Sequence, residues 1–150
     1  MLKVRATTPT RIDLAGGTLD IWPIPHILDH KATVNVGVTL MATAELSLTS
    51  GDRWSLISKD QKITVDGSFD IVTSTKRLPL LSLLLKALWR PELPAVTLTT
   101  SAESPAGAGL GGSSCLGIAV AGALWRARQE LDGWAAPAEG QLVQLVGDVE

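Results

Sequence analysis

Residues 104–114 read Ser104-Pro105-Ala106-Gly107-Ala108-Gly109-Leu110-Gly111-Gly112-Ser113-Ser114, and a long apolar run follows them. Closely spaced glycines let backbone N–H groups converge on one point without obstruction by Cβ atoms. Because 113–131 has a helical pattern, the positive end of that helix is expected to face the same point. This arrangement predicts a binding site for a phosphate group. The alternative is a turn between a strand and a helix that binds no ligand.

Three common nucleotide-binding loops do not fit this stretch. A Walker A loop ends in Gly-Lys-Ser/Thr, whereas Gly112 directly precedes Ser113 and no lysine follows Lys86. Residues 107–112 match G-x-G-x-x-G, but a dinucleotide-binding unit needs a second strand, and only helical patterns follow here. The glycine loop of protein kinases lies in a β-hairpin rather than before a helix.

Strand patterns fill the first half of the chain and helical patterns the second. Alternation over 2–7 predicts a half-buried strand that Pro9 should end, and 11–15 reads as a short extended piece. Two strands separated near Gly37 are expected over 32–48, a hairpin over 54–57 and 62–65, and a strand over 95–101. The stretch 19–31 contains Pro23 and Pro25 and is expected to be a loop. Helices are expected over 75–90, 113–131 and 137–149. In the second of these, Gly133 should follow the C-terminus, and Arg126 and Arg128 should mark the end that reaches solvent.

Composition narrows the class of protein. A hydrophobic share of 45% supports a folded core, and 150 residues suit one domain. The formal net charge of −2 argues against a partner nucleic acid, because such proteins usually carry a basic excess. The lone Cys115 cannot form an internal disulfide bond, and no run reaches the roughly 20 apolar residues that span a bilayer. We therefore expect a cytoplasmic protein without a membrane or nucleic-acid partner, and the oligomeric state stays open.

The glycine stretch also has a more specific form, Pro-x-Gly-x-Gly-Leu-Gly-x-Ser-Ser at the start of a helix. Its fixed positions are Pro105, Gly107, Gly109, Leu110, Gly111, Ser113 and Ser114. This form resembles the second signature motif of the GHMP kinases, a superfamily that includes galactokinase, homoserine kinase, mevalonate kinase and phosphomevalonate kinase. Members often have a serine where Gly112 stands.

A second stretch resembles the first motif of the same family. Residues 9–20 read Pro9-Thr10-Arg11-Ile12-Asp13-Leu14-Ala15-Gly16-Gly17-Thr18-Leu19-Asp20. Gly17 and Thr18 depart from the Glu and His that galactokinases carry, and the stretch is more similar to heptose-phosphate kinases and fucokinases. The resemblance covers the whole chain, 1–150, as the N-terminal, ATP-binding domain of the family. Because the chain ends within a helical pattern, we expect a C-terminal domain beyond Glu150.

The resemblance implies a fold, a reaction and a set of site residues. The fold is α+β, a mixed or antiparallel sheet with helices packed on one face and a left-handed βαβ unit. The reaction moves the γ-phosphoryl group of ATP, with Mg²⁺, to a hydroxyl of a small molecule, above all a sugar or sugar phosphate. The loop Gly107–Gly112, including Ala108, Leu110 and Gly111, would bind the phosphates, and Ser113 would hold Mg²⁺ or phosphate with Ser114 nearby. Arg11 would stabilise the transferred group and Asp20 would bind the acceptor. The general base would lie beyond residue 150, so this chain alone should have low or no turnover.

Several alternatives stay open at this point. Arg11 could be a surface arginine in a local ion pair, Asp20 a turn residue, and Asp13 structural. His26 and His30 are better explained as solvated loop residues than as a metal pair, because no third ligand has suitable spacing. For the whole protein, the alternatives are a mevalonate- or homoserine-type kinase, a non-catalytic nucleotide-binding module, and an interaction domain associated with RNA.

Overall fold

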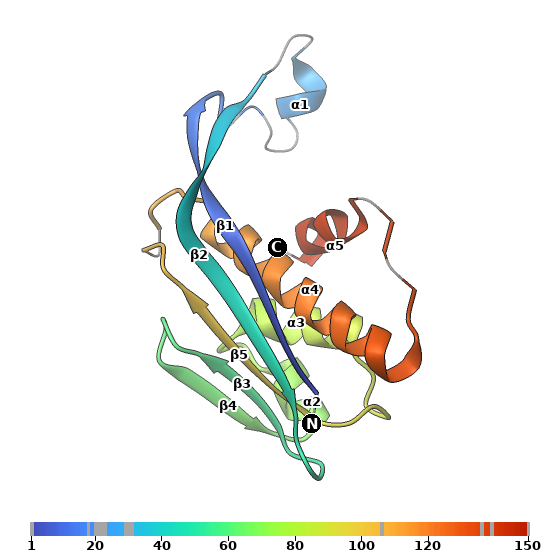
Figure 1. The fold of residues 1–150 in the computed structure, drawn as a ribbon. Coiled ribbons are helices and arrows are strands. Elements are labelled where there is room, and N and C mark those ends of the chain that lie inside the picture. Colours follow the sequence, from blue (N-terminus) through green and yellow to red (C-terminus); the bar gives the residue numbers. More distant parts are fainter. Residues whose placement is uncertain are drawn as a thin grey trace.

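The computed structural model describes residues 2–17, 19, 24–28, 32–105, 107–135, 137–138 and 140–149. Five strands form one sheet in the order β1-β2-β5-β3-β4 (Figure 1). Their bounds are β1 (Lys3–Ala15), β2 (Val34–Leu48), β3 (Trp54–Ser58), β4 (Ile63–Gly67) and β5 (Val96–Ala102). β5 pairs antiparallel with β2 and parallel with β3, so the sheet is mixed.

Helices cover one face of this sheet. They are α2 (Phe69–Ser74), α3 (Pro79–Leu88), α4 (Gly112–Asp132) and α5 (Gln141–Val149), while the short α1 (Ile24–Ile27) lies at the far end of the β1–β2 ribbon (Figure 1). α4 packs across β1, β2 and β5, α2 packs against β3 and β4, and α3 and α5 both pack against α4. The α+β prediction is therefore confirmed. The left-handed sense of the connection from β3 to β5 stays a prediction.

The core lies between the sheet and these helices. Along β5, Val96, Leu98 and Thr100 are buried while the residues between them are partly exposed, as expected of a strand with one covered face. The largest fully buried apolar side chains come from both layers: Leu46, Leu56, Leu84, Leu85, Leu98 and Leu124. No helix in the described part of the chain is long and apolar enough to cross a membrane.

β1 and β2 differ from the sequence prediction. Pro9 does not end the first strand, because β1 continues to Ala15 and Pro9 pairs with Met41. β1 is an edge strand, and an edge strand tolerates a residue without an N–H group. Gly37 does not separate two strands either: β2 is one strand of 15 residues, and the pairing shifts between the partners of Pro9 and Arg11.

The remaining elements follow the predictions more closely. The hairpin is β3–β4, the strand over 95–101 is β5, and the helix that follows the glycines is α4, whose C-terminal Gly133 has a left-handed φ of 68°. The helix expected over 75–90 is confined to Pro79–Leu88, and the helix expected over 137–149 to Gln141–Val149. α2 was not predicted, because a helix of six residues leaves too short a pattern to recognise. Within 19–31, expected to be a loop, 24–27 form the single turn α1.

Arg128 also corrects an expectation. It does not reach solvent: the residue is 5% exposed. Its NH2 group donates to Asp132 Oδ2 at 2.7 Å, and NH1 donates to the carbonyl of Leu88 at 3.2 Å. The guanidinium group also lies 4.0 Å from the ring centroid of Trp134. These three partners satisfy the charge and allow it to be buried.

Candidate functional site

The glycine-rich stretch forms a surface loop between β5 and α4. Gly107, Gly109 and Gly111 have φ values of 76°, 70° and 63°, in the left-handed region that favours glycine. A Cβ atom at Gly107 or Gly109 would meet nothing within 4 Å. The glycines are therefore needed for the path of the backbone, and the space beside the loop is open.

Most of the backbone N–H groups in this loop have no acceptor within the described part of the chain. The N–H of Ala108 donates to the carbonyl of Pro105 at 3.2 Å, and the first hydrogen bond of α4 runs from Cys115 N to Gly111 O at 3.0 Å. Gly111 is the N-cap residue of α4 and provides no side-chain cap. Among the described residues, no acceptor contacts the N–H groups of Gly109, Leu110, Gly111, Gly112 and Ser113. A row of such donors at a helix N-terminus is suited to an anion.

One hydrogen bond and one close approach fix the beginning of α4. The hydroxyl of Thr8 donates to the carbonyl of Cys115 at 2.6 Å, which ties β1 to the first turn of the helix. A Cβ atom at Gly112 would lie 2.9 Å from Oγ of the buried Ser104. Next to this turn, Ser113 is exposed and Ser114 is half-buried, so the Ser113 side chain lies at the surface beside the open amides.

An irregularity in β1 brings Arg11 to this loop. Up to Thr10 the even-numbered residues of β1 are the more buried, whereas Arg11 and Asp13 are the more buried residues beyond it. This reversal coincides with the register shift between Pro9 and Arg11, as expected when a β-bulge changes the direction of side chains. The bulge therefore decides which side of the ribbon carries the arginine.

Arg11 contacts the glycine loop through its backbone and its side chain. Its N–H donates to the carbonyl of Leu110 at 3.2 Å. Its Cγ and Nε lie 3.8 and 3.9 Å from the point that a Cβ of Gly111 would occupy. Nε also lies 3.4 Å from Oδ1 of Asp13. The local ion pair, which was an alternative explanation of Arg11 from the sequence, is therefore present. The same arginine also lies beside the glycine loop.

The remaining residues of the first motif are only partly described. Gly16 has a left-handed φ of 74°, and a Cβ atom at Gly17 would lie 2.8 Å from Oδ2 of Asp13. Asp20, the predicted acceptor-binding residue, lies outside the described residues, as do Ala106 and His30. His26 is exposed on α1. No group of three or more His, Cys, Asp or Glu side chains suited to a metal occurs within the described ranges.

The resolved shifts in pKa lie away from this loop. The pKa of Asp66 is lowered, first by a hydrogen bond from Ser55, and the pKa of Asp132 is lowered, first by its hydrogen bond with Arg128. Asp66 belongs to the β3–β4 hairpin and Asp132 to the end of α4, so both carboxylates make structural contacts.

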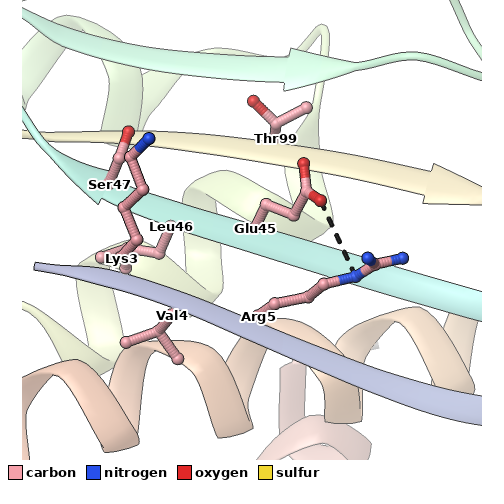
Figure 2. Close-up of a pocket in the computed structure, with 7 residues that line it drawn as sticks. All are labelled: Lys3, Val4, Arg5, Glu45, Leu46, Ser47 and Thr99. Atoms are coloured by element: carbon pink, nitrogen blue, oxygen red, sulfur yellow. Dashed lines mark ion pairs between the residues drawn. The ribbon is translucent and has the colours of Figure 1, made fainter.

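A surface hollow of about 370 Å³ lies at the other end of β1 (Figure 2). Arg5 and Glu45 face each other across it, with Nε and Oε1 3.7 Å apart, and Lys59 contacts the same carboxylate at 3.7 Å. The lining residues are Lys3, Val4, Arg5, Glu45, Leu46, Ser47 and Thr99. None of them belongs to the two motifs, so we regard the glycine loop and Arg11 as the candidate site.

Sequence reasoning missed two contributors to this site. It left Asp13 as possibly structural and did not consider Thr8. The alternation of Arg11 and Asp13 on one strand was a usable signal, because residues two apart share a face. Thr8 had no local signal, since its partner Cys115 is distant in sequence.

The chain is similar to known proteins in sequence and in fold. The family model described as GHMP kinases N terminal domain matches residues 61–150, which include the glycine loop. No curated protein sequence matches the chain.

Solved structures of several kinases share the fold. A D-glycero-D-manno-heptose 1-phosphate kinase from Bacteriodes thetaiotaomicron superposes with a TM-score of 0.77 at 21% identity, over 99% of this chain and 48% of that one. The Methanococcus jannaschii mevalonate kinase gives 0.73 at 14% identity, over 99% and 46%. The Lactococcus lactis galactokinase complexed with galactose gives 0.66 at 18% identity, over 98% and 37%. The chain thus spans less than half the length of each, and at these identities the likeness concerns the fold. Together with the family match over more than half of the sequence, it places this chain in the GHMP kinase family, as an N-terminal domain.

Proposed function

We propose that the full-length protein transfers the γ-phosphoryl group of ATP to a hydroxyl of a small molecule, a sugar or sugar phosphate. The observation that carries this proposal is that Arg11 lies beside Gly111 in a loop where the amides of Gly109–Gly112 have no acceptor among the described residues. Asp13 offsets part of the positive charge of Arg11, and the guanidinium group together with the positive end of α4 favours a further anion beside the loop. A nucleoside triphosphate tail supplies such an anion.

Each part of the site has a proposed role. The N–H groups of Gly109–Gly112 bind the β- and γ-phosphates, and Arg11 stabilises the negative charge on the transferred group through charge-assisted hydrogen bonds. Asp20 binds the acceptor. The exposed hydroxyl of Ser113, next to these amides, fits a role in holding Mg²⁺, which when bound neutralises charge on the phosphates. Phosphoryl transfer depends mostly on such positioning and charge stabilisation.

The proposal also specifies the class of molecule that accepts the phosphoryl group, a sugar or sugar phosphate. Its support is the motif form Arg11-Ile12-Asp13-Leu14 and the heptose 1-phosphate kinase and galactokinase among the similar structures. A mevalonate-type acceptor is the second candidate, because a mevalonate kinase superposes almost as well.

The test is an assay of ADP release by the full-length protein with sugars, heptose phosphates, mevalonate and homoserine. We expect turnover with a sugar or sugar phosphate, and a loss of about 100-fold or more in kcat for Arg11→Ala. The matched control is Arg5→Ala, which removes an exposed arginine from the same strand and should leave kcat unchanged. Binding of ATP without turnover on any acceptor would instead identify a non-catalytic nucleotide-binding module.

A further inference from the structure

Asp13 lies in a confined position between Arg11 and the turn that follows β1. Its Oδ1 is 3.4 Å from Arg11 Nε, and both of these atoms are shielded from solvent; the contact is an ion pair without hydrogen-bond geometry. The two side chains share a face because they are two residues apart on a strand. The bulge before Arg11 turns that face toward the glycine loop.

Gly17 closes the other side of the Asp13 carboxylate. A Cβ atom at Gly17 would lie 2.8 Å from both Cβ and Oδ2 of Asp13, so the glycine backbone fills the space next to it. The carboxylate therefore has little freedom to rotate away from Arg11. As a whole, the Arg11 side chain is 42% exposed, so Asp13 restrains the arginine at Nε without enclosing it.

We propose that Asp13 is a positioning residue, which holds the Arg11 side chain against the glycine loop before any ligand binds. This inference rests on the proposed function, because it gives Arg11 a phosphate to contact. Arginine is a flexible side chain that loses much conformational entropy when it is fixed. A partner that restrains Nε reduces the entropy still to be lost when the phosphate binds. A fully exposed ion pair would contribute little to holding the arginine in place. The Arg11–Asp13 pair differs because Nε and Oδ1 are shielded from solvent.

The test measures binding of MgATP and MgADP to the full-length protein by calorimetric titration. Asp13→Ala should weaken MgATP binding about tenfold, and Asp13→Asn, which keeps an oxygen acceptor, should weaken it less. MgADP binding should change less than twofold in both variants, because Arg11 is assigned to the γ-phosphate. Glu45→Gln is the matched control, since it removes the carboxylate of the exposed Arg5–Glu45 pair, which joins β1 to β2 away from the loop.

A double-mutant cycle separates positioning from a general structural role. In an Arg11→Ala background, Asp13→Ala should have no further effect on MgATP binding, because no guanidinium group remains to be held. Equal losses in both backgrounds, or equal losses for MgATP and MgADP, would overturn the proposal. The proposal would also be overturned if Asp13→Ala bound MgATP as tightly as the wild type while Arg11→Ala bound it more weakly. In that case the proposed function would stand. If Arg11→Ala itself binds MgATP normally, the role of Arg11 in the proposed function fails, and the role of Asp13 fails with it. Thermal unfolding of each variant verifies that it is folded, and the isosteric Asp13→Asn serves if Asp13→Ala is not.

Discussion

Replacing Gly111 with alanine tests whether the shape of the loop matters for binding. Gly111 has φ 63° and ψ 28°, a left-handed conformation that costs a residue with a Cβ atom about 1–2 kcal/mol. The new methyl group would lie 3.8 Å from Arg11 Cγ, an ordinary contact, so the cost comes from the backbone alone. If the alanine loop relaxes to another conformation when free and must return to this one to bind a phosphate, the dissociation constant rises by up to the equivalent of this free energy, about 5- to 30-fold.

Gly133 provides a matched control at the other end of α4. It has nearly the same conformation, φ 68° and ψ 21°, and a Cβ atom there would meet nothing within 4 Å. Gly133→Ala should therefore lower the free energy of unfolding by a similar 1–2 kcal/mol and leave the affinity for MgATP unchanged. Calorimetric titration and thermal unfolding of the two full-length variants measure both quantities. Wild-type affinity in Gly111→Ala, or equal loss of affinity in both variants, would refute the reasoning.

Three further predictions concern stability. Arg128→Lys should lower the free energy of unfolding, measured by chemical denaturation, by about 1.5–3 kcal/mol, because lysine cannot contact Asp132 and Leu88 at once. As a control, Arg126→Lys, which changes an exposed pair with Glu130, should lower it by less than about 0.5 kcal/mol. Arg128 lowers the pKa of Asp132 below its ordinary 3.8, so the pair stabilises the fold at neutral pH and the effect is lost as pH falls through the lowered pKa. Asp132→Asn should consequently lower Tm at about pH 7, and its effect should shrink as the pH falls below about 4; an effect on Tm that is constant across this range would contradict the assignment. Gly117→Ala would place a Cβ atom 2.6 Å from Val146 Cγ1; the strain of about 1–3 kcal/mol should exceed the gain in helix propensity, and urea denaturation should find it relieved in a Val146→Ala background.

Much of the fold could be predicted because its signals are local. The β3–β4 hairpin, β5 and α4 each have a periodic pattern bounded by glycine or a turn, and such patterns need no knowledge of the rest of the molecule. The continuation of β1 through Pro9 depended instead on the strand lying at the edge of the sheet, which is a tertiary property. The burial of Arg128 likewise depended on the carbonyl of Leu88, which belongs to another helix.

The candidate site divides in the same way. Sequence alone predicted a glycine loop at a helix N-terminus, and that is where the loop lies. It could not predict that a bulge reverses the exposure of β1 and brings the Arg11 side chain beside Gly111, with Asp13 on the same face as Arg11, because register is set by pairing with β2. The roles of Arg11, Asp20 and Ser113 came from the resemblance and stay predictions.

The position of β5 has a consequence for how this chain is made. β5 joins the β1–β2 pair to the β3–β4 pair, yet it follows all four of those strands in sequence. During synthesis, two separate hairpins must therefore wait with unpaired inner edges until residues 96–102 leave the ribosome. Exposed edges can pair with other nascent chains, and joining distant segments is slow. For this topology, the folding step most exposed to misassembly is the insertion of β5, which completes the sheet.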